Sequence, residues 1–127
     1  MLGIDRRSLE IGIAETIMEE YNGTPPPIYS EADLFNYDIP QCDVLLCLSL
    51  VMYFFKDRED TEAWDLIDRI GRCSPKMYLD CGGMYANHLP FHSKDAGRAI
   101  VDRSTYTSWT LLGTTALESR PLFMIWR

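Results

Sequence analysis

The sequence is short of basic residues. Its 127 residues include 12 Lys and Arg against 19 Asp and Glu, which gives a net charge of −7. A surface of that sign repels the phosphate backbone of nucleic acids, so we expect no autonomous binding to DNA or RNA. The charge balance favours a small molecule or a protein as the substrate or partner.

Long apolar runs are also missing. The longest, residues 44–55, is interrupted by Ser49 and is shorter than the roughly 18 residues that a membrane-spanning helix needs. The N-terminal segment Met-Leu-Gly-Ile-Asp-Arg-Arg lacks the basic-then-apolar order of a signal peptide. We therefore expect a cytoplasmic protein without a membrane contact.

The cysteines and histidines do not form a metal-binding pattern. The four cysteines lack Cys-x-x-Cys spacing, and several stand in apolar runs, so the sequence predicts reduced thiols in the core. His88 and His92 are four residues apart, but Pro90 between them breaks any helix that would align them on a metal ion. We expect neither a metal ion nor a disulfide. The cysteines are Cys42, Cys47, Cys73 and Cys81.

The composition is that of a single globular domain, with 46% hydrophobic and 24% charged residues. The period of the apolar pattern switches repeatedly along the chain, as it does where strands and helices alternate. This pattern predicts an α/β domain over residues 1–127, with a mostly parallel sheet and an antiparallel C-terminal hairpin. The predicted strands cover 1–4, 28–32, 43–48 and 76–80; the helices begin at Ser8 and cover about 58–70 and 93–102; the hairpin joins 108–112 to 121–126.

Two of these elements carry more specific expectations. In the first helix, capped by Ser8 and ended by Asn22-Gly23, an apolar stripe is predicted to face the core. The stripe contains Leu9, Ile13, Ile17 and Tyr21, widened by Ala14 and Met18. The strand 43–48 is apolar on both faces, which is typical of a central strand buried on both sides of a parallel sheet.

Polar side chains stand where the predicted parallel strands end, which is where ligands bind in open α/β sheets. Asp5 ends the first strand, Asp33 follows the second, and Ser49 follows the third. A carboxylate in such a place can accept both hydroxyls of a ribose, and a second can accept the amino group of a base. Two structural alternatives stay open: Asp5 as a cap of the helix that follows it, and Asp33 as a turn residue.

Five segments resemble a known family when they are taken in order. They are Leu-Gly-Ile-Asp at 2–5, Ala-Asp-Leu at 32–34, Asp-Val-Leu-Leu-Cys-Leu-Ser at 43–49, Lys-Met-Tyr-Leu-Asp at 76–80, and the closing Leu-Phe-Met-Ile-Trp. Together they look like the class I S-adenosylmethionine-dependent methyltransferases, from their second strand to their last. The resemblance covers nearly the whole chain and implies a Rossmann-like, methyltransferase-type sheet and S-adenosylmethionine as cofactor.

The resemblance also implies roles for individual residues. Asp5 matches the family's ligand of the ribose hydroxyls, and Arg6 beside it would lie near the adenine. Asp33 matches the acceptor for the adenine amino group, and Leu34 would pack on the ring. The cofactor and the substrate would meet at Leu48 and Ser49, with Tyr53 toward the substrate. No side chain is implied as a catalytic base, because methyl transfer in this class depends mainly on positioning.

The sequence departs from the family at its start. The first strand and its Gly-x-Gly-x-Gly loop, which wraps the methionine part of the cofactor, have no counterpart. This strand is central in the family's sheet, so the strands 1–4 and 43–48 lack their shared neighbour. Three solutions stay open: direct pairing of the two strands, a second copy or partner chain in the gap, or a truncated domain. The function is then either methyl transfer or, alternatively, that of a non-catalytic interaction module that keeps the fold.

Overall fold

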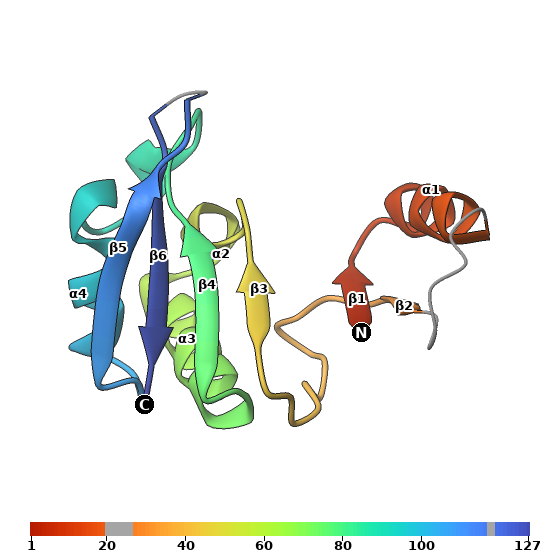
Figure 1. The fold of residues 1–127 in the computed structure, drawn as a ribbon, viewed down its shortest axis with the longest axis horizontal. Helices are drawn as coiled ribbons and strands as arrows, with labels where there is room; N and C mark the ends of the chain where they lie inside the picture. Colours follow the sequence, from red (N-terminus) through yellow and green to blue (C-terminus); the bar gives the residue numbers. More distant parts are fainter. Residues whose placement is uncertain (20–26, 117–118) are drawn as a thin grey trace. The chain divides into compact units, whose positions relative to one another are not determined.

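The computed structural model describes residues 1–19, 27–116 and 119–127 (Figure 1). It forms two compact units, Met1–Ile39 (unit 1) and Pro40–Arg127 (unit 2). The predicted helix stop at Asn22-Gly23, and Tyr21 before it, lie outside the described residues. A single domain over the whole chain stays a prediction. Within the described ranges, no helix has the length and apolar character needed to cross a membrane.

Unit 1 is a strand–helix–strand unit built from β1 (Leu2–Asp5), α1 (Ser8–Glu19) and β2 (Ile28–Glu31). The two strands pair in parallel, as predicted, with Leu2 opposite Ile28 and Asp5 opposite Glu31. Their carboxyl ends therefore lie at the same edge of the two-stranded sheet. Gly3 allows this packing, because a Cβ atom there would lie 2.6 Å from Cδ1 of Tyr29.

The apolar stripe of α1 is exposed, which corrects the expectation that it faces the core. Leu9, Ile13 and Ile17 are 69%, 51% and 61% exposed. Ala14 and Met18 are half-buried, on the side of the helix nearer the strands. The stripe is left open in unit 1 because a two-stranded sheet covers only one side of the helix.

Unit 2 contains a four-stranded sheet with the order β3-β4-β6-β5. Its strands are β3 (Leu45–Cys47), β4 (Lys76–Asp80), β5 (Ser108–Thr114) and β6 (Pro121–Trp126). β3 and β4 are parallel, and β6 runs antiparallel to both β4 and β5. This arrangement confirms the mixed sheet and the C-terminal hairpin that the sequence predicts.

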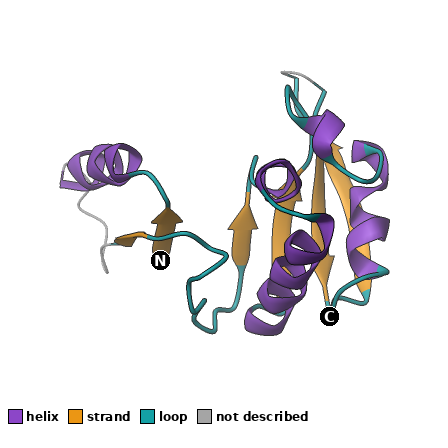
Figure 2. Ribbon diagram, turned by 180° about the vertical axis from the view of Figure 1, so that it is seen from behind, coloured by secondary structure: helices purple, strands orange, loops and turns teal. Residues whose placement is uncertain are grey.

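The helices of unit 2 lie on one face of its sheet (Figures 1 and 2). They are α2 (Val51–Asp57), α3 (Asp60–Cys73) and α4 (Ala96–Val101), with single turns of 3-10 helix at η1 (Ala86–His88) and η2 (Ser93–Asp95). The sequence analysis missed α2 and ended α3 too early, at Gly71. The predicted helix 93–102 is η2 followed by α4. His92 caps η2, because its Nδ1 accepts a hydrogen bond from the Lys94 N–H at 3.3 Å.

The core of unit 2 lies between these helices and the sheet. Side chains from β4 and β6 pack there with side chains from α3, and each is at most 2% exposed. Burial of one such side chain stabilises the fold by about 1.5–3 kcal/mol, so this layer is the main source of the stability of unit 2. Its central members are Met77, Leu79, Phe123, Ile125, Leu66, Ile67 and Ile70.

The strand predicted to be central and buried on both faces is neither. Cys47 is 2% exposed, but the alternate residues Val44, Leu46 and Leu48 are 46%, 61% and 48% exposed. Among the described strands, β3 pairs with β4 alone and stands at the edge of its sheet, while β1 belongs to the other sheet. Figure 2 shows α2, α3 and α4 on one face of the sheet, and the exposure of Leu46 against the burial of Cys47 shows that no described element of unit 2 covers the Leu46 face.

Gly71 gives a test of the packing under α3. A Cβ atom there would lie 2.5 Å from Oγ1 of Thr105 and 3.3 Å from Cε2 of the buried Tyr106. We expect Gly71→Ala to lower the free energy of unfolding by about 1–3 kcal/mol in urea denaturation, although alanine is the better helix former. Gly12→Ala in α1 is the matched control, because its Cβ would meet no atom within 4 Å. Equal effects of the two substitutions would contradict this account.

Candidate functional site

The carboxyl ends of β3 and β4 meet at a buried carboxylate. Asp80 ends β4 and is 8% exposed. Its Oδ1 accepts a hydrogen bond from the backbone N–H of Ser49, just after β3, and its Oδ2 lies 3.4 Å from Ser49 Oγ. Ser49 has a φ of 56°, a left-handed backbone conformation that is strained for a residue with a side chain. The carboxylate thus holds Ser49 in a backbone conformation that it would rarely adopt alone.

Arg120 joins this pair from the loop before β6. Its Nη1 donates to Ser49 Oγ at 2.6 Å and lies 3.8 Å from Asp80 Oδ2. The approach requires a glycine at position 82, because a Cβ there would lie 2.8 Å from Cγ of Arg120. We call Ser49, Asp80 and Arg120 the strand-end cluster. It combines a positioned hydroxyl with one negative and one positive group, and Asp80 and Arg120 are both largely shielded from water.

Two buried thiols lie next to the strand-end cluster in sequence. Cys47 precedes Ser49 by two residues, and Cys81 directly follows Asp80. Burial, and secondly the negative charge of Asp80, together raise the pKa of Cys47 to about 12. Burial, followed by the charges of Cys47 and Asp80, also raises the pKa of Cys81 far above its ordinary value. At neutral pH both groups are therefore neutral thiols, which are poor nucleophiles and poor metal ligands. They therefore behave as small apolar side chains.

An aromatic pair lies in the segments that follow the same two strands. Tyr53 of α2 and Tyr85, before η1, have ring centroids 5.1 Å apart. The ammonium group of Lys56 lies 4.1 Å from the centroid of Tyr85 and 5.6 Å from that of Tyr53. Cation–π attraction of this kind holds the lysine over both rings. The pair presents planar, polarizable surfaces beside the carboxyl edge of the sheet.

In unit 1, both predicted aspartates lie at the carboxyl edge of the parallel pair. Asp5 ends β1, and Asp33 follows β2 by two residues. The Oδ1 atom of Asp5 accepts from the N–H of Arg7 at 2.9 Å, and that of Asp33 accepts from the N–H of Phe35 at 3.0 Å. Asp33 therefore has the turn role that was its alternative, whereas Asp5 binds the N–H of Arg7, which precedes α1, rather than an N–H of the helix itself. A carboxylate has capacity for further donors, so this role does not exclude a ligand.

The structure divides the predicted site residues between the units. Asp5, Arg6, Asp33 and Leu34 belong to unit 1, and Leu48, Ser49 and Tyr53 belong to unit 2. Ser49 is brought together with Asp80 and Arg120, whereas Leu48 is 48% exposed on the uncovered face of β3. Sequence reasoning gave Asp80 no firm role and missed Arg120, Lys56 and Tyr85. The available signal was topological, since Asp80 ends β4 and Ser49 follows the end of the parallel strand β3 by two residues.

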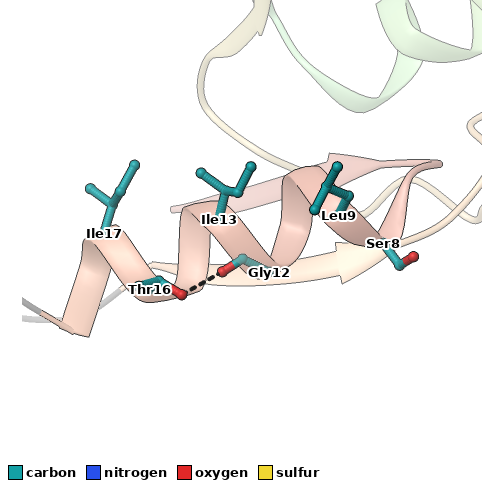
Figure 3. Close-up of a pocket in the computed structure, with 6 residues that line it drawn as sticks. All are labelled: Ser8, Leu9, Gly12, Ile13, Thr16 and Ile17. Atoms are coloured by element: carbon teal, nitrogen blue, oxygen red, sulfur yellow. Dashed lines mark hydrogen bonds between the residues drawn. The ribbon is translucent and has the colours of Figure 1, made fainter.

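An open pocket lies on α1 of unit 1 (Figure 3). Leu9, Ile13 and Ile17 project from the same side of the helix, and Thr16 Oγ1 donates to the carbonyl of Gly12 at 2.8 Å. The pocket is apolar, so it lacks the carboxylates that a nucleoside site needs. It is lined by Ser8, Leu9, Gly12, Ile13, Thr16 and Ile17.

Solved methyltransferases share the fold of this chain. The bifunctional kinase-methyltransferase WbdD matches with a TM-score of 0.78 at 15% identity, over 98% of this chain and 29% of WbdD. Magnesium protoporphyrin IX methyltransferase (ChlM) from Synechocystis PCC 6803 with bound SAM matches with a TM-score of 0.69 at 17% identity. The match covers 99% of this chain and 59% of the solved chain. The same enzyme with bound SAH matches with a TM-score of 0.73 at 14% identity, and the match covers 99% of this chain and 63% of the solved chain.

This likeness shows a methyltransferase fold, which confirms the α/β class and the general resemblance. The chain spans less than two thirds of each of these solved chains. No family model and no curated protein matches the sequence. These structural likenesses do not test whether the family's first strand is absent, so its absence stays a prediction.

Asp80→Asn tests the strand-end cluster. The substitution keeps the side-chain shape but removes the charge that binds the Ser49 N–H and faces Arg120. We expect the free energy of unfolding to fall by about 1.5–3 kcal/mol, the scale of hydrogen bonds to a charged group. Asp65→Asn, on an exposed position of α3, is the control and should change it by less than about 0.5 kcal/mol in the same urea titration. A loss no larger than that of the control would refute the role given to Asp80.

The buried thiol of Cys47 gives a prediction about pH. Its pKa is about 12 in the folded chain against an ordinary value of 9.0, so the folded state binds this proton more tightly than the unfolded state. The free energy of unfolding should therefore fall as pH rises from about 9 to 12, by up to about 1.4 kcal/mol per pH unit for this group. Cys47→Ala should make the alkaline slope shallower by that amount and leave it unchanged below pH 8. Parallel slopes for the two proteins would contradict the prediction.

Proposed function

We propose that this chain is an S-adenosylmethionine-dependent methyltransferase-like domain that acts on a small molecule or a protein. The observation that carries the proposal is the placement of Asp5 and Asp33 at one carboxyl edge of a parallel strand pair, in a chain with a methyltransferase fold. Two carboxylates at such an edge suit a nucleoside, whose ribose hydroxyls and base amino group are all donors. The net charge of −7 makes nucleic acid an unfavourable substrate.

The residues present fit the nucleoside part of the cofactor. Asp5 would bind the ribose hydroxyls, Asp33 the adenine amino group, and Leu34 the face of the adenine ring, with Arg6 beside it. S-adenosylmethionine supplies an activated methyl group when bound. This assignment uses acceptor chemistry that the two carboxylates still have after their local backbone hydrogen bonds.

In this proposal, unit 2 would position the methyl acceptor. Ser49 is fixed from both sides, by Asp80 at its N–H and by Arg120 at its hydroxyl, so its backbone stays in one conformation. Leu48 next to it, and Tyr53 in α2, would position the cofactor and the acceptor. Rigid placement of this kind is the main requirement of in-line methyl transfer, because the reaction gains most from correct alignment.

A partner chain or a second copy is part of the proposal. The edge strand β3 exposes Val44, Leu46 and Leu48, and an apolar edge strand is a template for pairing with another strand. The sequence also shows no counterpart of the glycine-rich loop that holds the methionine part of the cofactor in the family. We therefore propose that the isolated chain binds the cofactor weakly, through its nucleoside, and that full binding needs a strand supplied by the partner.

A non-catalytic interaction module is the second candidate function. It is favoured by the apolar side chains exposed in both units, on α1 in unit 1 and on β3 in unit 2. Exposed apolar patches of this kind mark interaction surfaces in folded proteins. In this alternative the fold is kept, but the carboxylates of Asp5 and Asp33 have only their local backbone roles.

Titration calorimetry with S-adenosylhomocysteine and with adenosine tests the proposal. Because the nucleoside provides most of the contacts, we expect the two ligands to bind the isolated chain with similar, weak affinity. Asp5→Ala should weaken both by about 10- to 100-fold, the scale of a charge-assisted hydrogen bond. Glu15→Ala, an exposed carboxylate of α1, is the matched control and should leave both affinities unchanged.

Light scattering on the same samples separates the outcomes. Weak nucleoside binding that strengthens with self-association supports both the cofactor site and the role of the partner. A strictly monomeric chain with micromolar affinity for S-adenosylmethionine would show that no added strand is needed. Absence of heat with either ligand, together with self-association, would favour the interaction module.

A further inference from the structure

Two cysteines meet at the edge of unit 2 opposite the strand-end cluster. Cys42 lies in the irregular segment before β3, and Cys73 is the last residue of α3, shortly before β4. The backbone N–H of Cys42 donates to the carbonyl oxygen of Cys73 at 3.0 Å. Since β3 and β4 are parallel and each residue comes shortly before one of them, both residues stand at the amino edge of the sheet.

The backbone contact of this pair is compatible with a disulfide. Given ordinary bond lengths, a 3.0 Å hydrogen bond between the two main chains limits the separation of the Cα atoms to about 7 Å. Disulfides join Cα atoms that are roughly 4.4–6.8 Å apart. Cys42 is in a segment without regular structure, so its side chain can turn toward the end of α3 without breaking a helix or a strand.

Exposure separates this pair from the other two cysteines. Cys42 and Cys73 are half-buried, whereas Cys47 is 2% exposed and Cys81 is fully buried. The sequence expectation that all four are core thiols is therefore wrong for Cys42 and Cys73, because they stand at the ends of elements rather than within the core layer. A small reagent in solvent can therefore reach Cys42 and Cys73 but not Cys47 and Cys81.

We propose that Cys42 and Cys73 are a redox-active pair that closes to a disulfide with a low-molecular-weight disulfide such as oxidised glutathione. The thiolate of one cysteine attacks the oxidant, forms a mixed disulfide and releases one glutathione as its thiol. The second protein thiolate then attacks the mixed disulfide and releases the other glutathione. The protein loses two electrons and two protons, and the oxidant is reduced to two thiols.

The disulfide would tie the entry of unit 2 to the end of α3. The segment that it closes contains β3, α2 and α3, which include the half of the core that α3 provides. Closing a long segment restricts the unfolded chain more than the folded one and so raises thermal stability. The proposal does not depend on methyl transfer, since the pair stands at the other edge of the sheet from Ser49 and Asp80.

The test is oxidation of the full chain with glutathione disulfide at pH 8, followed by alkylation and intact-mass and peptide mass spectrometry. We expect the loss of two hydrogens, a cross-linked peptide pair that contains Cys42 and Cys73, and unmodified Cys47 and Cys81. The thermal midpoint should rise by about 10 °C and return on reduction with dithiothreitol. Cys42→Ser and Cys73→Ser should each stop at a single glutathione adduct on the remaining thiol of the pair.

Two results would overturn the proposal. One is a wild-type chain that carries glutathione separately on Cys42 and Cys73, which would show that the thiols cannot reach each other. The other is a cross-link that involves Cys47 or Cys81 in the folded chain. If a serine variant does not fold, the reversible change in the midpoint of the wild-type chain, with its peptide map, still decides the outcome.

Discussion

One buried carboxylate organises the carboxyl edge of unit 2. Asp80 receives the N–H of Ser49 from the end of β3 and faces the guanidinium of Arg120 from the start of β6. A strained backbone conformation such as that of Ser49 costs about 1–3 kcal/mol, and a charge-assisted hydrogen bond offsets a cost of that size. Without that charge, three chain segments would lose the group that holds them together, and the hydroxyl of Ser49 would lose its fixed direction.

The same carboxylate explains why the neighbouring thiols are inert. Its negative charge adds to the effect of burial on Cys47 and Cys81, so both remain protonated at neutral pH. Chemistry by thiols is thereby confined to Cys42 and Cys73 at the opposite edge of the sheet. Unit 2 thus has a polar edge where Ser49 is positioned and a second edge where the backbones of two half-buried cysteines, Cys42 and Cys73, are hydrogen-bonded.

The sequence predicted the elements whose signal is local. β4 and the β5–β6 hairpin have their own apolar pattern and turn residues, and unit 1 follows from the order strand, helix, strand. The sequence did not predict that β3 is exposed at Leu46, because burial of a strand depends on which strands and helices stand beside it. It missed α2 for a related reason. Its residues at 51–55 are all apolar, so the sequence shows no polar face there that would mark a helix, although four of the five are buried in the fold.

Like the fold, the candidate site could be predicted from the sequence only in part. Ser49 could be found from its position after a strand, and Asp5 and Asp33 from theirs, since parallel strands bring their ends to one edge. Arg120 could not, because its distance from Ser49 in the sequence is spanned only by the antiparallel return of β6. Side chains that reach a site from remote loops leave no periodic signal in the sequence.

The sheet order of unit 2 has a consequence for how the chain folds during synthesis. β6 follows β5 in the sequence but lies between β4 and β5, and it pairs with both. When β3, α2, α3, β4 and α4 have left the ribosome, the backbone groups on one edge of β4 are still without their strand, and the Leu79 side of the sheet lacks Phe123 and Ile125. Folding of unit 2 must therefore wait for residues 121–126, and until then the nascent chain exposes an apolar edge that holdase chaperones recognise.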